Sequence, residues 1–450
     1  MPLVRTATHD VSALIDEARF SPFQVRILII AIIISIVDGF DGQALGFALP
    51  ALSADFDLPL ATFTATISVG LIGMVAGGIV GGPLGDRFGR RSVLLASLAV
   101  FATGTLATAL VSTLEALFVL RLIVCLGIGG LLPNLMALMT EYAPARLRIA
   151  VTTFVVGALG LGGVAGGLFA ASVIPSFGWH SIFIGGGVVG ILLFVIGLVL
   201  LPESIRFDVQ RGRTNTVRAS LSRITGRTDF SADDEYVIPG ETAEKRGSVK
   251  ELFRNGRGST TILLWLIFAF NLLIVYLMIN WLPSLLSEAG YTAETAAITM
   301  SVYNVGGIIG AVVIGLLGGR IGKPAVVLGI AYTVGTVLLL LLQTVDGSVG
   351  QLYALAGGIG LCIVGGQAAL SGLASAAYPT SVRATAAGWA WGVGRLASIL
   401  GPSIGGGLLA LGVSPVAIVG YAAVPSGLAA VLVLILAAIR RSRPIGHDVA

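Results

Sequence analysis

Twelve long apolar stretches constrain this chain more than any other feature of its sequence. Each contains about 20 residues or more, enough for a helix to cross a hydrocarbon core of ~30 Å, whereas barrel strands need only about ten alternating residues. Hydrophobic residues make up 56% of the 450 residues and charged residues 11%, against about a quarter charged in soluble domains. The sequence therefore predicts an all-α integral membrane protein with twelve transmembrane helices. The stretches lie at 26–50, 62–82, 92–112, 114–141, 150–172, 181–201, 259–283, 292–318, 325–344, 350–378, 384–411 and 414–439.

The positive charges divide the loops into two classes. All but two of the 27 Lys and Arg residues precede or begin the first stretch, lie in alternate loops or follow the last stretch. Loops rich in Lys and Arg stay in the cytoplasm, so we expect a multi-pass protein of the inner (cytoplasmic) membrane with both termini in the cytoplasm. The two exceptions, Arg121 and Arg395, lie inside apolar stretches.

Two loop sequences occur twice. The loop GPLGDRFGRR (Gly82 to Arg91) has a degenerate copy, GLLGGRIGKP (Gly315 to Pro324), and YAPARLRIA from Tyr142 corresponds to YPTSVRATA from Tyr378. Such an internal repeat is typical of transporters built from two related halves, with the substrate site between them near the bilayer midplane.

The repeat predicts three parts. Residues 1–201 form an N-terminal six-helix bundle, 202–258 a cytoplasmic linker and 259–450 a C-terminal six-helix bundle. The linker is rich in Arg, Asp, Thr and Ser, and we expect a short amphipathic helix with flexible chain around it. Its basic character favours contact with anionic lipid over nucleic acid.

Several motifs resemble those of a known family. GDRFGRR and LPESIRF (Leu201 to Phe207) resemble signatures of the major facilitator superfamily. More narrowly, DGFDGQALGFALP, RLIVCLGIGGLLPNLMALMTEYAP and RATAAGWAWGVGRLASILGP, in the first, fourth and eleventh stretches, resemble the aromatic acid:proton symporter family. The second loop departs from the pattern, because Gly319 stands where the first loop has Asp86.

The resemblance implies a function. It implies the major facilitator fold and proton-coupled uptake, by alternating access, of a benzoate, hydroxybenzoate, protocatechuate or gentisate type of acid. The fifth stretch, GALGLGGVAGG, lacks the glycine-proline motif common in the superfamily's antiporters, which favours symport. The proton gradient would supply the energy without a cofactor.

Asp38 and Asp41 are the acidic groups that most need an explanation, because they lie inside the first apolar stretch. An aspartate at a helix centre costs about 2.5 to 3.5 kcal/mol on insertion scales. The two are three residues apart and so share a helix face with Ser35 and Leu45, which must look into protein or water. Burial raises carboxyl pKa values by up to ~3 to 5 units, so both are candidates to carry the proton.

Arg395 is our candidate for the substrate anion. Arginine keeps its charge when buried and offers a planar fork that matches a carboxylate. Twelve residues separate Arg395 from Arg383, as they separate Asp38 from Arg26, which places both near mid-membrane. Trp391 is one turn before Arg395 and could hold an aromatic ring, although packing explains it equally well. Arg121 is either a substrate ligand or the structural partner of an aspartate.

Further polar residues complete the predicted sites. Glu141 ends the fourth stretch, where we expect it to pair with Arg146 or Arg148. Candidate cavity-lining groups are Asn271, Tyr276, Asn280, Tyr303 and Asn304. By resemblance to the family's gating loop, the candidate gating residues are Asp86, Arg87, Gly89, Arg90 and Arg91, with Glu141 and Arg148 beside them.

Other classes of function find less support. The spans contain no nucleophile paired with a base, so we do not expect an enzyme, and Cys125 and Cys362 have no chelating neighbours that would indicate a metal site. Nothing indicates nucleic acid or an obligate protein partner. Two alternatives remain open: a proton-coupled exporter of drugs or other organic compounds, and a membrane sensor that binds ligand without moving it.

Overall fold

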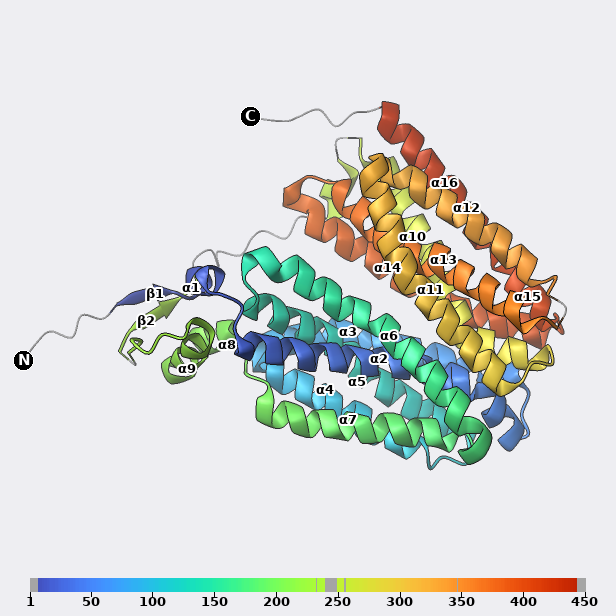
Figure 1. Ribbon diagram of the computed structural model, residues 1–450, viewed down its shortest axis with the longest axis horizontal. Helices are drawn as coiled ribbons and strands as arrows, with labels where there is room; N and C mark the ends of the chain where they lie inside the picture. The colour runs from blue at the N-terminus through green and yellow to red at the C-terminus, as the bar shows by residue number, and fades with distance from the viewer. Residues whose placement is uncertain (1–6, 232, 239–248, 255, 346, 443–450) are drawn as a thin grey trace, which may run out of the picture. The chain divides into compact units, whose positions relative to one another are not determined.

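The computed structural model describes residues 7–231, 233–238, 249–254, 256–345 and 347–442, most of them helical (Figure 1). Among these residues, twelve helical segments are long and apolar enough to cross a membrane, which confirms the predicted number. The spanning elements are α2 (Pro22–Asp55), η1 (Leu60–Phe63) with α3 (Thr64–Phe88), α4 (Arg90–Thr108), α5 (Leu114–Tyr142), α6 (Ala145–Phe177), α7 (His180–Leu200), α10 (Gly258–Glu288), α11 (Ala293–Ile321), α12 (Pro324–Leu342), α13 (Val349–Ala376), α14 (Thr380–Ala410), and α15 (Pro415–Tyr421) with α16 (Ala423–Ser442).

Hydroxyl side chains start four of these helices. Thr113, Thr292, Ser348 and Ser414 precede α5, α11, α13 and α15, and each accepts a hydrogen bond from the backbone N–H three residues later. Such a cap satisfies one of the amide donors that a helix leaves free at its first turn. All four caps follow loops without Lys or Arg, so the helices restart sharply on that side.

The chain divides into two compact units. One comprises Met1–Phe40, Ile72–Gly162 and Phe183–Glu244, and the other comprises Asp41–Leu71, Gly163–Ile182 and Lys245–Ala450. The division passes through α2, α3, α6 and the start of α7, so that one part of each of these helices belongs to each unit. The three-part organisation expected from the loop repeat stays a prediction.

Glycine allows very close helix packing in the first unit. An added Cβ at Gly39 of α2 would lie 2.0 Å from the carbonyl oxygen of Leu159 in α6, and one at Gly162 would lie 2.0 Å from that of Ile36. The backbones of α2 and α6 therefore touch beside the acidic stripe. Small residues allow this approach where apolar lipid provides no driving force for helix association.

The second unit contains the helices of the C-terminal half. Helix α11 packs along α13, α10 along α14, and α12 along α16. Glycine again sets the spacing, because a Cβ at Gly306 would lie 2.0 Å from the carbonyl oxygen of Gly357, and one at Gly360 would lie 1.9 Å from that of Tyr303. The buried core includes Phe268, Leu328 and other residues of α10, α12, α13, α14 and α16.

The linker has more structure than the sequence indicates. Helices α8 (Ile205–Gln210) and α9 (Thr214–Thr225) are followed by strand β2 (Glu235–Val237), which pairs in parallel with β1 (Thr8–Asp10) at the other end of the first unit's sequence (Figure 1). A 3-10 turn, η2 (Val249–Phe253), follows in the second unit.

The apolar side of α9 is covered by protein rather than lipid. Val217, Leu221 and Ile224 are buried, and α9 packs against α1 (Val11–Glu17), whose Val11 and Ile15 are buried in the same core. Helix α9 is the short amphipathic helix that we expected, but helix α8 and strand β2 show that residues 202–231 and 233–238 contain more regular structure than the expected flexible chain. Segments 239–248 and 255 lie outside the described residues.

Candidate functional site

The acidic stripe of α2 is buried as its sequence requires. Asp38 is 9% exposed and Asp41 is fully buried, and Ser35 and Leu45 on the same stripe are buried as well. Protein therefore covers this face instead of lipid, which avoids the insertion cost of two carboxyl groups. The stripe has the burial that a proton-carrying pair needs.

The two intramembrane arginines lie in different units. Arg121 of α5 is 5% exposed and belongs to the unit that contains Asp38. Arg395 of α14 is half-buried and belongs to the unit that contains Asp41. The backbone carbonyl of Arg395 accepts a hydrogen bond of 2.6 Å from Ser398.

Both tryptophans near Arg395 have aromatic neighbours. Trp391 makes an edge contact with Phe268, with ring centroids 5.8 Å apart, and Trp389 stacks on Trp265, also at 5.8 Å. Trp389 is 46% exposed. It is six residues before Arg395, so the helical spacing predicts that it does not share a helix face with Arg395. The Phe268 contact explains Trp391 by packing, which was the alternative to a ligand-binding role.

Most of the polar side chains in α10 and α11 are used within the protein. The Asn271 amide donates to the carbonyl of Ile363 in α13 at 3.0 Å, and the Asn280 amide donates to the carbonyl of Tyr276 at 2.8 Å. Tyr303 is 1% exposed. The amide groups of Asn271 and Asn280 therefore form hydrogen bonds within the protein.

Asn304 has a partner that the sequence does not reveal. It lies in α11 and exchanges two hydrogen bonds with Gln43 of α2: the Asn304 Nδ2 donates at 3.0 Å and the Gln43 Nε2 donates back at 3.2 Å. The Asn304 Nδ2 also donates to the carbonyl of Met300 at 2.8 Å. Gln43 is 6% exposed and Asn304 5%.

The predicted gating loop forms a network at the basic ends of α3, α4 and α5. Asp86 forms an ion pair with Arg90, and the Arg90 Nε lies 3.8 Å from a carboxylate oxygen of Glu141. Arg90 also donates to the carbonyl of Gly82 at 3.4 Å. In the second loop Gly319 has no side chain, so the acidic half of this arrangement has no counterpart there.

Glu203 is a central member of this network that we did not single out as a site residue. Its carboxylate accepts a hydrogen bond of 2.9 Å from the backbone N–H of Arg91, in the first turn of α4. A negative charge at that position suits the positive end of the helix dipole. The signal was present in the LPES segment, but sequence alone did not show which loop the glutamate contacts.

Both the backbone conformation and the lack of room for a side chain require glycine at position 89. Its φ of +100° disfavours side chains, and an added Cβ would lie 2.4 Å from a carboxylate oxygen of Glu203. Gly322, at the matching position of the second loop, also has a positive φ, of +68°. The repeat is therefore visible in the backbone as well as in the letters.

The expected partners of Glu141 are wrong. Its side chain contacts Ser204 and Arg90, whereas the arginines of the following loop turn to the N-terminal segment. Arg146 donates to the carbonyls of Asp16 and Ala18, both at 2.7 Å. Sequence proximity suggested the pairing, but Arg146 begins a new helix.

The remaining gating candidates connect to the N-terminal segment and to the linker. The Arg148 Nη2 lies 3.4 Å from a carboxylate oxygen of Asp16. The backbone carbonyl of Arg87 accepts a hydrogen bond of 3.1 Å from Arg211, in the linker. The loop is therefore tied to both the N-terminal segment and the linker.

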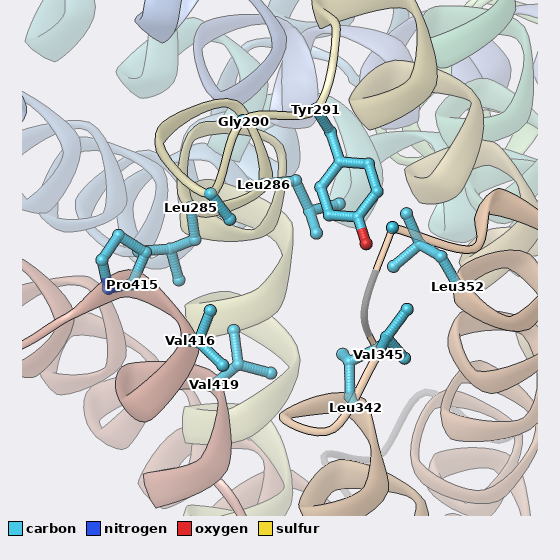
Figure 2. Close-up of a pocket in the computed structure, with 12 residues that line it drawn as sticks. Leu285, Leu286, Gly290, Tyr291, Leu342, Val345, Leu352, Pro415, Val416 and Val419 are labelled. Carbon is cyan, nitrogen blue, oxygen red and sulfur yellow. The ribbon is translucent and has the colours of Figure 1, made fainter.

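A separate pocket of about 370 Å³ lies in the second unit (Figure 2). Figure 2 shows it between Leu285, Tyr291, Leu352 and Val416, where Tyr291 contributes a hydroxyl group. Among the described residues that line it, none is charged. It lacks a cation for a carboxylate and is therefore a poor candidate for the anion site.

The described residues contain no group of three or more His, Cys, Asp or Glu side chains that could hold a metal ion. Buried carboxyl groups in the first spanning helix and a charge network at the first of two related loops are instead the parts of a twelve-helix membrane transporter.

The chain belongs to the Major Facilitator Superfamily, whose family model matches residues 31–402. It is 36% identical to the 4-hydroxybenzoate transporter PcaK of Pseudomonas putida over 427 residues, which cover 95% of each chain. It is 34% identical to the gallate transporter of the same species, with 90% of each chain covered.

The fold agrees with this assignment. A solved structure of the xylose transporter XylE from Escherichia coli matches with a TM-score of 0.69 at 18% identity, covering 91% of this chain and 95% of that one. Family membership makes this protein a multi-pass transporter rather than an enzyme.

Proposed function

We propose that this protein imports an aromatic carboxylate across the cytoplasmic membrane together with a proton, by alternating access. The observation that carries the proposal is the buried Asp38 and Asp41 pair, in a chain whose full-length relatives are named as transporters of 4-hydroxybenzoate and gallate. Both of those compounds are hydroxylated benzoates, so the substrate class is a small flat ring with a carboxylate.

The roles of the ionisable groups follow from their chemistry. A proton on the aspartate pair removes charge from the membrane interior, which lowers the barrier for the helix that carries it. The two carboxyl groups lie three residues apart on one helix face, so either can hold the transported proton. Arg395 stays charged and pairs with the substrate carboxylate through its planar fork.

The orientation follows from the loop charges. The network of Asp86, Arg90, Glu141 and Glu203 lies at loops rich in arginine, which face the cytoplasm under the positive-inside rule. Both termini then lie in the cytoplasm. In this orientation the network holds the inner ends of α3, α4 and α5 together, and the four capped helices restart on the outer side.

Uptake by purified protein in vesicles tests this function. The panel comprises radiolabelled benzoate, 4-hydroxybenzoate, protocatechuate, gentisate and gallate, with an imposed pH gradient and with or without a protonophore. We expect accumulation of at least one acid that collapses with the protonophore, and no binding of that acid by Arg395→Ala. Flux outward only, in exchange for protons, would identify an exporter; ligand binding without flux would identify a sensor.

A further inference from the structure

One end of the second unit joins helices from both sequence halves. The segments 41–71 and 163–182 come from α2, η1, α3, α6 and the start of α7, yet they pack with the helices of residues 245–450. No Lys or Arg occurs in segments 41–71 and 163–182. By the loop charges, this end faces the outside.

The Gln43 and Asn304 pair lies at this end. Each amide both donates and accepts, so one side chain satisfies the other across the two helices. Gln43 follows Asp41 by two residues, and Asp41 is fully buried while the pair is formed. The amide pair therefore forms in a conformation in which water does not reach that carboxyl group.

Gly163 of α6 provides the space that the pair occupies. An added Cβ would lie 2.2 Å from Gln43 Nε2 and 2.7 Å from Asn304 Oδ1. These atoms are the ends of flexible side chains, so a methyl group there would push the amides apart without moving a backbone. Only glycine at position 163 therefore leaves room for the Gln43 and Asn304 side chains to pair.

Other contacts at this end also join helices of the two sequence halves. The hydroxyl oxygens of Ser68 in α3 and Ser403 in α14 are 3.0 Å apart, and the Ser301 hydroxyl donates to the carbonyl of Val164 at 3.1 Å. A Cβ at Gly46 would lie 2.6 Å from the carbonyl oxygen of Ile279. The two halves meet here through small residues and neutral hydrogen bonds, without ion pairs among the described residues of these contacts.

We infer that Gln43, Asn304 and Gly163 form the outer gate, in which the amide pair closes access to Asp41 and breaks once in each transport cycle. The inference rests on the proposed function for its direction of transport. The geometry favours a gate over a permanent structural link, because neutral amide bonds between helices are modest in strength and are replaced by water when the helices part. A permanent joint at this end would prevent alternating access.

A disulfide between α3 and α14 at this end tests whether the two sequence halves must separate here during transport. We replace Cys125 and Cys362 with alanine, confirm uptake, and then introduce Ser68→Cys with Ser403→Cys. The matched control is Thr336→Cys with Ser426→Cys, whose hydroxyl oxygens are 2.9 Å apart within the C-terminal half. We expect both pairs to cross-link on oxidation, and only the first to abolish uptake, with recovery on reduction.

Glycine substitutions test whether the amide pair closes access from outside. The Ser301 side chain is only 3% exposed. A cysteine at this position (Ser301→Cys) would react with a membrane-impermeant maleimide, added from outside, only when the gate opens. Gly163→Ala should raise its labelling rate by about tenfold, the population change produced by about 1.4 kcal/mol. Gly157→Ala, in the same helix, meets no atom within 4 Å and should leave labelling unchanged. Gln43→Ala should match Gly163→Ala.

Labelling and cross-linking need no substrate, so they report on the gate even if the proposed substrate or coupling is wrong. Uptake that persists through the Ser68 to Ser403 disulfide would overturn the inference, as would failure of that pair to cross-link while the control pair does. Equal labelling in the Gly163→Ala and Gly157→Ala proteins would also overturn it.

Discussion

Replacing Gly89 with alanine is the sharpest test of the network that Asp86, Arg90, Glu141 and Glu203 form. The substitution meets two obstacles: a φ of +100° and a Glu203 carboxylate oxygen 2.4 Å from the new Cβ. Backbone strain of this kind costs about 1 to 3 kcal/mol. Moving Glu203 loses its charge-assisted hydrogen bond to the Arg91 amide, worth about 1.5 to 3 kcal/mol. The expected loss of unfolding free energy is the sum of these two costs, about 2.5 to 6 kcal/mol.

The measurement is an SDS titration of the purified protein in mixed micelles, with uptake measured in parallel. Gly82→Ala is the control, because its added methyl group meets no atom within 4 Å and alanine is favoured over glycine in a helix by up to about 1 kcal/mol. Comparing the Gly89→Ala/Glu203→Ala protein with Glu203→Ala alone isolates the backbone strain, because neither protein retains the Glu203 carboxylate. Equal stability of Gly89→Ala and Gly82→Ala would refute the reasoning.

Three further predictions address other contacts. Tyr142→Phe removes a 2.6 Å hydrogen bond to the Glu203 carbonyl and should lower the unfolding free energy by about 1 kcal/mol in the same titration. Arg395→Lys keeps the charge but loses the planar fork, so binding of the transported acid, measured by calorimetry, should weaken by about tenfold or more; unchanged affinity would remove Arg395 from the site. Backbone hydrogen bonds from Ser231 and Ala7 hold the pKa of Asp234 below its usual range. The ionised Asp234 therefore stabilises strand β1 above about pH 4, and this stabilisation is lost as the pH falls through the lowered pKa. A spin label at Thr8 should become more mobile over that fall in pH. The Asp234→Asn protein should show no such transition.

The twelve spanning segments could be predicted because they depend on the solvent around the chain. Length and hydropathy give each spanning helix without knowledge of its neighbours, and the cost of a charge in lipid required the Asp38 and Asp41 face to be buried. Both conclusions follow from one short segment at a time. That is the kind of information that a single sequence carries.

The contacts between distant segments could not be predicted. Gln43 and Asn304 are 261 residues apart, and neither amide indicates its partner. Strands β1 and β2 have three residues each, too short for a pattern, and become recognisable only as a pair. Glu141 was assigned to the nearest arginines in sequence, but its partners come from α4 and the loop after α7.

The most direct test of the central claim measures proton and substrate flux together in vesicles that contain the wild-type protein or Asp41→Asn. An entrapped pH dye follows protons while radiolabelled acid from the uptake panel follows substrate. We expect the wild-type protein to move protons and substrate inward together. We expect Asp41→Asn still to exchange labelled for unlabelled acid, but no longer to accumulate the acid against a gradient. Accumulation by Asp41→Asn that still collapses with the pH gradient would contradict the account.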